Sequence, residues 1–385
     1  TLDGFLTRFP DSTFLVVREV PETEQGVREF LDEIAPPKVR DREIEDGVRA
    51  GVTPTAMLAA AAGKSVSELW TLLDLLPVGY SDVELDELEL QDARDALTRP
   101  AIFDPTSLAV LADLGVDVEA AVLNALPSSI IAQSTLVDAD RATAPENDPR
   151  RSVAVVARDR GGQPRVVETD ADEPTRRARL HESQLRIAQS LTAEPDAVPG
   201  SNDELERALN DDEPPVDLAL RTWVATLTTA RRRRLPVLSD DRRVRGYVRA
   251  EGLPSFGTHT LLRALREIGD ISDELYESAR AQLLRRGAVG LLPDGDELIE
   301  VVRANSWQPT PAVMRVLQDE ARWRNDPIAA WGAVVRLLHG VFRDGPGELR
   351  PWVARVLEIA RLAQPGAPMA GHHVALLATA WGWTS

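Results

Sequence analysis

The sequence contains no cysteine, and this absence excludes several chemistries at once. Disulfide bonds, thiolate metal sites and nucleophilic catalysis by Cys are all ruled out. The sequence also has no signal peptide and no apolar run of about 18 residues or more, so we expect a cytoplasmic protein without a membrane partner. It has no glycine-rich phosphate loop, no Ser-His-Asp order, no zinc-ligand spacing and no internal repeat.

Basic residues are outnumbered by acidic ones, 44 to 62, which gives a net charge of −18. This balance favours solubility and argues against a nucleic-acid-binding surface over the whole chain, although a local basic groove stays possible. The 385 residues are enough for two or three domains, and the 43% of hydrophobic residues supply a sizeable core. Because the chain starts at Thr1 rather than at Met, we expect further domains upstream in a longer protein.

Sequence patterns divide the chain into a mostly helical region, an α/β domain and a second helical region, at residues 1–97, 98–300 and 301–385. Within the α/β domain, residues 150–215 form an expected insertion of a hairpin and a linker. It has a β-hairpin around Gly161-Gly162, a helix at about 174–191, and a mobile connection or short helix at 192–214. In the last region we predict helices over 310–324, 327–343, 350–363 and 370–381.

The first region is expected to contain a strand at 12–20, a helix at 22–34, and helices with a break between 41 and 75. Ser65 and Glu68 have the spacing of a capping box at the start of the last of these helices. The arrangement resembles a helix-turn-helix unit, but the second helix has acidic residues and no Arg or Lys. The acidic side chains of this helix would be repelled by DNA phosphates. We therefore favour an ordinary packed helical hairpin.

Acidic residues follow three short apolar segments of the α/β domain. Asp104 follows 101–103, a helix with Asp138 follows 128–132, and Ser239-Asp240-Asp241 follows 235–238. Alternation of such segments with helical patterns predicts a mainly parallel sheet. Open α/β sheets place their chemistry at the carboxyl ends of the strands. Because adjacent acids repel each other, a bound divalent cation is one way to offset their charge.

Taken in order, these segments resemble a PIN-type nuclease domain, and most closely the large bacterial PIN-domain-containing proteins of conflict systems. Asp104 and Thr106 match the opening Asp-x-Ser/Thr motif, and Ser239 to Asp241 match the Thr/Ser-x-Asp motif. Asp138, or less closely Asp140, stands where the family usually has Glu. The resemblance covers roughly residues 45–345, including strings that begin at Gly51, Leu238 and Ser255.

The resemblance implies a three-layer α/β/α domain with a small parallel sheet, and a metal-dependent nuclease that prefers RNA to DNA. In such an enzyme a Mg²⁺ or Mn²⁺ ion activates water for phosphodiester cleavage. The implied metal ligands are Asp104, Asp138, Asp240 and Asp241. The resemblance implies catalytic roles for Asp104, Asp138 and Asp241, and supporting roles for Thr106, Ser239 and Thr258. Arg242 and Arg245 directly follow the acids and are expected to bind nucleic acid.

Two departures from the family pattern favour an alternative, a catalytically inactive PIN-like scaffold or sensor module. The second acid is Asp rather than Glu, and Thr258 or His259 lies where many members have a fourth acid. A lone His such as His259 is also more often structural than a ligand or proton carrier.

Each acid can also be read as a helix cap rather than as a ligand. If the acids do cluster without metal, the pKa of at least one should be raised. The arginines at 231–234 fit either a phosphate-binding rim or a helix end whose cations complement the helix dipole.

Overall fold

The structure is a computed structural model, and it describes most of the chain between residues 51 and 345. The described residues are 43–44, 47–48, 51–72, 86–97, 99–144, 149, 154–158, 164–168, 172–196, 218–288, 290–291, 293–318, 323, 327–345, 352 and 355–356. The predicted strand at 12–20 and the predicted helices at 22–34 and 370–381 lie outside these residues, as does most of 350–363.

A small parallel sheet of five strands forms the centre of the fold, in the order β5-β2-β1-β6-β7. Its strands are β1 (Ile102–Phe103), β2 (Ile130–Ala132), β5 (Thr192–Glu194), β6 (Val237–Leu238) and β7 (Ser255–Phe256). The apolar segments before the acids are thus β1, β2 and β6, as predicted. Ile102 is in register with Ile130 on one side and with Val237 on the other, so the ends of these three strands lie at one edge.

Strand β5, at residues 192–194, corrects the expectation of a mobile connection or short helix over 192–214. It pairs with β2 at one border of the sheet, where its three residues are exposed or only partly buried. An edge strand with one solvated side does not need a continuous apolar run, so the sequence carried no strand pattern here.

Helices cover both faces of the sheet, and the alternation of the strand side chains separates two cores. Ile102, Ile130 and Val237 pack in one core with α4 (Thr55–Ala61), α12 (Leu218–Arg233) and α13 (Arg242–Ala250). Phe103, Ile131 and Leu238 pack in the other core with helices of the opposite layer. These helices are α7 (Pro105–Leu114), α8 (Val116–Ala125), α10 (Glu173–Ser190) and α14 (Thr258–Ile268). The domain is therefore a three-layer α/β/α structure, as predicted.

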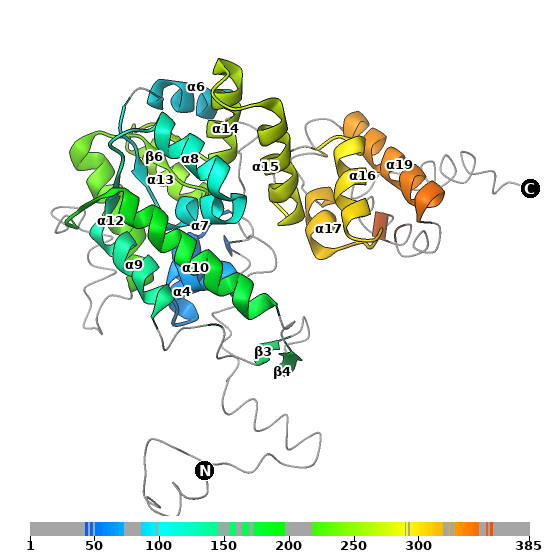
Figure 1. The fold of residues 1–385 in the computed structure, drawn as a ribbon, viewed down its shortest axis with the longest axis horizontal. Coiled ribbons are helices and arrows are strands. Elements are labelled where there is room, and N and C mark those ends of the chain that lie inside the picture. Colours follow the sequence, from blue (N-terminus) through cyan, green and yellow to red (C-terminus); the bar gives the residue numbers. More distant parts are fainter. Residues whose placement is uncertain are drawn as a thin grey trace, which may run out of the picture.

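Further elements surround this domain (Figure 1). They are α5 (Val66–Leu72), α6 (Asp86–Ala96), α9 (Gln133–Thr143), the antiparallel hairpin β3 (Ala154–Arg158) and β4 (Pro164–Glu168), α15 (Asp273–Arg285), α16 (Gly295–Ala304), α17 (Pro311–Leu317) and α19 (Pro327–Asp344). The hairpin was predicted. Helices α16, α17 and α19 lie together beyond α15, away from the sheet. None of the helices in the described part of the chain combines the length and apolar character needed to cross a bilayer.

The segment that resembles a helix-turn-helix forms a packed hairpin of α4 and α5, as favoured from the sequence. Helix α5 buries six of its seven residues, and Trp70 has no exposed surface. A DNA-reading helix would instead have to present its side chains to a groove. The predicted capping box is present, since Glu68 N donates to Ser65 Oγ (3.1 Å) and Ser65 N donates to Glu68 Oε2 (2.7 Å).

A buried ion network joins α6 to α13. Glu89 Oε1 accepts hydrogen bonds from Arg245 Nε (3.0 Å) and Arg249 Nη1 (2.9 Å), and neither Glu89 nor Arg245 is more than 1% exposed. Arg245 also donates to the backbone oxygen of Ser239, directly before the two adjacent acids. The network therefore fixes the strand end from which those acids project.

We predict that Glu89→Gln lowers the free energy of unfolding by about 3 kcal/mol or more, because it leaves the buried Arg245 without its main counter-charge. Urea denaturation checks this value. Glu267→Gln is the matched control, since its pair with Arg94 is about a third exposed and should contribute less than about 1 kcal/mol. Equal effects of the two substitutions would contradict the importance of the buried network.

Candidate functional site

Asp104 joins the end of β1 to the end of β6. As the N-cap of α7 it accepts a hydrogen bond from Ser107 N (2.9 Å), and its other oxygen accepts one from Ser239 Oγ (2.7 Å). Thr106 Oγ1 lies 2.8 Å from Asp104 Oδ1 and accepts from the N–H groups of Asp240 (3.0 Å) and Asp241 (3.1 Å). The two motifs recognised in the sequence are thus one hydrogen-bonded unit.

Asp240 and Asp241 point to different helices. Asp240 accepts from Thr258 N (2.8 Å) and Thr258 Oγ1 (2.5 Å) at the start of α14. Asp241 is the N-cap of α13, where its Oδ1 accepts from Arg243 N (2.8 Å) and Val244 N (3.2 Å). Its Oδ2 accepts from Thr55 N (2.6 Å), the first residue of α4.

Asp138 projects from α9 and is held by the start of α5. Its two oxygens accept hydrogen bonds from Val66 N and Ser67 N, both at 2.9 Å. Its carboxylate has Glu68, rather than Asp104 or Asp241, as its main acidic neighbour. We call Asp104, Asp138, Asp240 and Asp241 together the acid centre.

The acid centre is almost completely buried, with exposures of 0 to 4%. Burial raises the pKa of Asp104 and Asp138 to about 6, and that of Asp240 to about 7. Hydrogen bonds to the three carboxylates oppose this rise. Repulsion from Asp241 raises the pKa of Asp104 further, and repulsion from Asp104 does the same for Asp240, but both are smaller effects than burial. The expected direction is therefore confirmed, although the main cause is loss of solvent rather than crowding of charge.

The acid centre does not fit a divalent cation in this arrangement. Within the described ranges, no three His, Asp or Glu side chains come together in a way that could hold a metal ion. Mg²⁺ needs several oxygen ligands and keeps part of its water shell, which requires open space beside the carboxylates. Here the carboxylates are buried and their oxygens already accept hydrogen bonds from backbone and hydroxyl groups.

The two arginines expected to bind nucleic acid lie in different environments. Arg242 is exposed and its side chain lies over Gly51, whose positive φ of 70° suits glycine. Arg245 is only 1% exposed and pairs with Glu89, so the expectation that it contacts nucleic acid does not agree with the structure. The expectation fails because a packed helix turns some of its side chains inward. Arg245 lies one turn after the N-cap of the nine-residue helix α13, on its inward face.

Other candidates from the sequence have structural partners. Arg232 and Arg233 pair with Glu194, and Arg231 lies 3.7 Å from Glu251, so these cations of the predicted basic zone have carboxylate partners. Buried His259 lies 3.1 Å from Tyr276 Oη, and burial lowers its pKa to about 3. It links α14 to α15, which agrees with the structural interpretation of a lone histidine.

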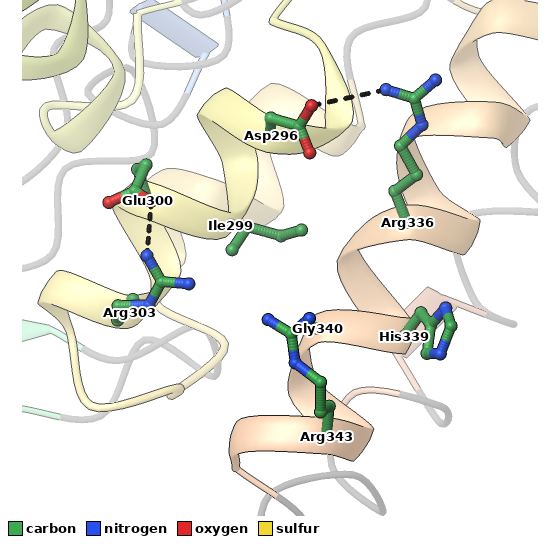
Figure 2. A pocket seen from close by; sticks show the side chains of 8 residues that line it. All are labelled: Asp296, Ile299, Glu300, Arg303, Arg336, His339, Gly340 and Arg343. Atoms are coloured by element: carbon green, nitrogen blue, oxygen red, sulfur yellow. Dashed lines mark hydrogen bonds and ion pairs between the residues drawn. The ribbon is translucent and has the colours of Figure 1, made fainter.

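A hollow of about 380 Å³ between α16 and α19 is a second candidate binding site (Figure 2). Three arginines line it, but each has an acidic partner, in the pairs Arg303–Glu300, Arg336–Asp296 and Arg343–Asp344. The hollow therefore has little net charge, and such exposed pairs give it no strong attraction for a polyanion.

The sequence did not reveal the donors that the hairpin of α4 and α5 gives to Asp138 and Asp241. Backbone N–H groups of residues 55, 66 and 67 supply them, and an N–H group is common to every residue except proline. The helix starts themselves were detectable from Pro54 and from the capping box at Ser65. Their proximity to acids 71 to 186 positions away was not.

The domain is thus a three-layer α/β/α structure with buried acids near the carboxyl edge of a small parallel sheet. Residues 102–250 match the family model described as "PIN domain associated with the TPR-GreAB-C-PIN system". This part of the chain is therefore a member of the PIN-domain-like superfamily. A search of the curated proteins and a search of the solved structures each found no match.

We predict that Asp241→Asn lowers the free energy of unfolding by about 1 to 3 kcal/mol in metal-free buffer. Asp241 uses one oxygen for α13 and the other for Thr55 N, whereas an amide has a single acceptor oxygen and leaves one of these helix starts unpaired. Urea denaturation at pH 7 measures the loss. Asp140→Asn is the control, because Asp140 is exposed on α9. A variant as stable as the wild type, or more stable, would show that charge repulsion outweighs capping.

A second prediction concerns pH. Burial raises the folded-state pKa of Asp240 to about 7, above the unfolded value of about 4. Its contribution to stability is therefore fully present below about pH 4 and is lost as the pH rises through 7. As the pH rises from 4 to 8, the free energy of unfolding of Asp240→Asn should increase by a few kcal/mol relative to that of the wild type.

Denaturation of both proteins at several pH values measures this shift. The buried histidines titrate in both and cancel in the comparison. A difference that stays constant over this range would refute the raised pKa.

Proposed function

We propose that the chain carries a PIN-like module whose acid centre is structural, so that the module works as a scaffold or sensor in a larger protein. One observation supports this most: all four carboxylates are buried and accept hydrogen bonds from the starts of helices. The module spans residues 98–300 in this proposal, with 150–215 inserted and helical regions on both sides. Upstream domains and RNA are its proposed partners, in the bacterial cytoplasm.

A second candidate function is a metal-dependent endoribonuclease. The family match supports it, because PIN domains are typically nucleases that use divalent metal ions. The junction of Asp104, Thr106 and Ser239 at adjacent strand ends also supports it, since it brings residues of the two motifs into contact. In this case the buried acids would have to become accessible before Mg²⁺ or Mn²⁺ could bind.

Cleavage assays decide between the two functions. We predict that the purified chain, given millimolar Mn²⁺ or Mg²⁺, cleaves mixed RNA and DNA oligonucleotides no faster than the double variant Asp104→Asn, Asp241→Asn. Gel analysis of labelled oligonucleotides measures the rate, and circular dichroism checks that the variant is folded. Metal-dependent cleavage by the wild type and by Asp140→Asn, but not by the double variant, would refute the structural proposal and support the nuclease.

A further inference from the structure

The hairpin of α4 and α5 lies outside the residues that match the PIN family model, yet it contacts the acid centre directly. Helix α4 packs against α12, and α5 packs against α7, α9 and α10. The hairpin thus touches helices of both layers around the sheet. It supplies donors to Asp241 through Thr55 N and to Asp138 through Val66 N and Ser67 N.

These donors solve an energetic problem of the acid centre. A buried carboxylate without partners is costly, and the cost is offset by hydrogen bonds or by an opposite charge. The first N–H groups of a helix have no acceptor inside the helix, so they are free to donate to such a carboxylate. Asp138 and Asp241 are the acids assigned from the motifs to the second and third metal-ligand positions, and both accept hydrogen bonds from the hairpin.

We propose that the hairpin replaces a divalent cation as the partner of Asp138 and Asp241. The PIN-like domain is then complete without metal, and the hairpin is an obligatory part of it. The inference rests on the structural role proposed above for the acid centre. It adds a reason why Asp138 and Asp241 do not fit a cation: backbone N–H groups already donate to carboxylate oxygens that a metal would need.

The hairpin is anchored rather than loosely laid over the site. Trp70 of α5 is fully buried in the core on one face of the sheet, and Thr71 Oγ1 lies 2.8 Å from Nε2 of buried His181 on α10. Helix α4 buries Ala56 and Ala59 in the other core. Because both cores include hairpin residues, the donors are held in place by the packing of the whole domain.

Thr55→Pro tests the inference with little other disturbance. Thr55 is the first residue of α4, where proline removes no helical hydrogen bond, and Pro54 already has the extended backbone (φ −63°, ψ 144°) that a following proline requires. The substitution therefore removes mainly the N–H group that donates a hydrogen bond to Asp241 Oδ2. Thr55→Ala is the matched control, because it removes the side chain and keeps the N–H.

We expect Thr55→Pro to melt roughly 3 to 8 °C below Thr55→Ala in metal-free buffer, because Asp241 Oδ2 loses a donor in a buried position. Millimolar Mn²⁺ should raise the melting temperature of Thr55→Pro, but not that of Thr55→Ala or the wild type. Equal melting of the two variants would overturn the inference. So would a Thr55→Pro protein that ignores Mn²⁺, or a wild type that gains as much from the ion.

Amide hydrogen exchange on the wild type keeps the inference testable if Thr55→Pro fails to fold. First-turn amides normally exchange quickly, so protection at Thr55, Val66 and Ser67 would support the bonds to the acids, and fast exchange would overturn them. The two proposals fail separately. Metal-dependent cleavage by the wild type defeats the structural role of the acid centre, whereas equal melting of the Thr55 variants defeats the inference about the hairpin alone.

Discussion

Burial of carboxylates at the carboxyl edge of the sheet is the constraint on which the rest of this domain depends. A carboxylate that loses its water must gain donors. Four carboxylates lie in the interior here, Asp104, Asp240 and Asp241 at the ends of strands and Asp138 on α9. The starts of helices provide those donors: α7 for Asp104, α5 for Asp138, α14 for Asp240, and both α13 and α4 for Asp241. The positions of these helices around the sheet are therefore linked to the acids as well as to the apolar cores.

The same constraint explains the buried ion network behind the site. Arg245 donates to Ser239 O at the end of β6, and Glu89 of α6 neutralises its charge. The guanidinium also lowers the pKa of Asp240, against the larger effect of burial. Arg245 thus fixes the end of β6, joins α6 to α13 and offsets part of the charge of Asp240. These three roles account for its buried position, whereas binding of nucleic acid would require an exposed side chain.

The sequence predicted the parts of this structure that have a local pattern. Apolar segments before Asp104 and Asp240 correspond to β1 and β6, and the spacing of Ser65 and Glu68 identified a helix start. It did not predict β5, whose residues are half-exposed at the edge, or the inward direction of Arg245. It also could not show that the start of α4 meets Asp241, because a backbone N–H has no residue-specific signal and 186 positions separate the two residues.

The departures from the family pattern agree with a centre held by donors. The resemblance implies a fourth acid in the neighbourhood of Thr258 or His259, and there Thr258 donates through both its N–H and its hydroxyl to Asp240. Where the family usually has Glu, Asp138 has a shorter side chain whose two oxygens meet successive N–H groups of one helix start. A cation would require more acceptor atoms beside Asp240 and Asp138. Instead, Thr258 donates to Asp240, and Asp138 accepts hydrogen bonds from the start of α5. In the proposed structural role, both departures reduce the need for a metal ion by the same means, which is hydrogen bonding to the acids from within the fold.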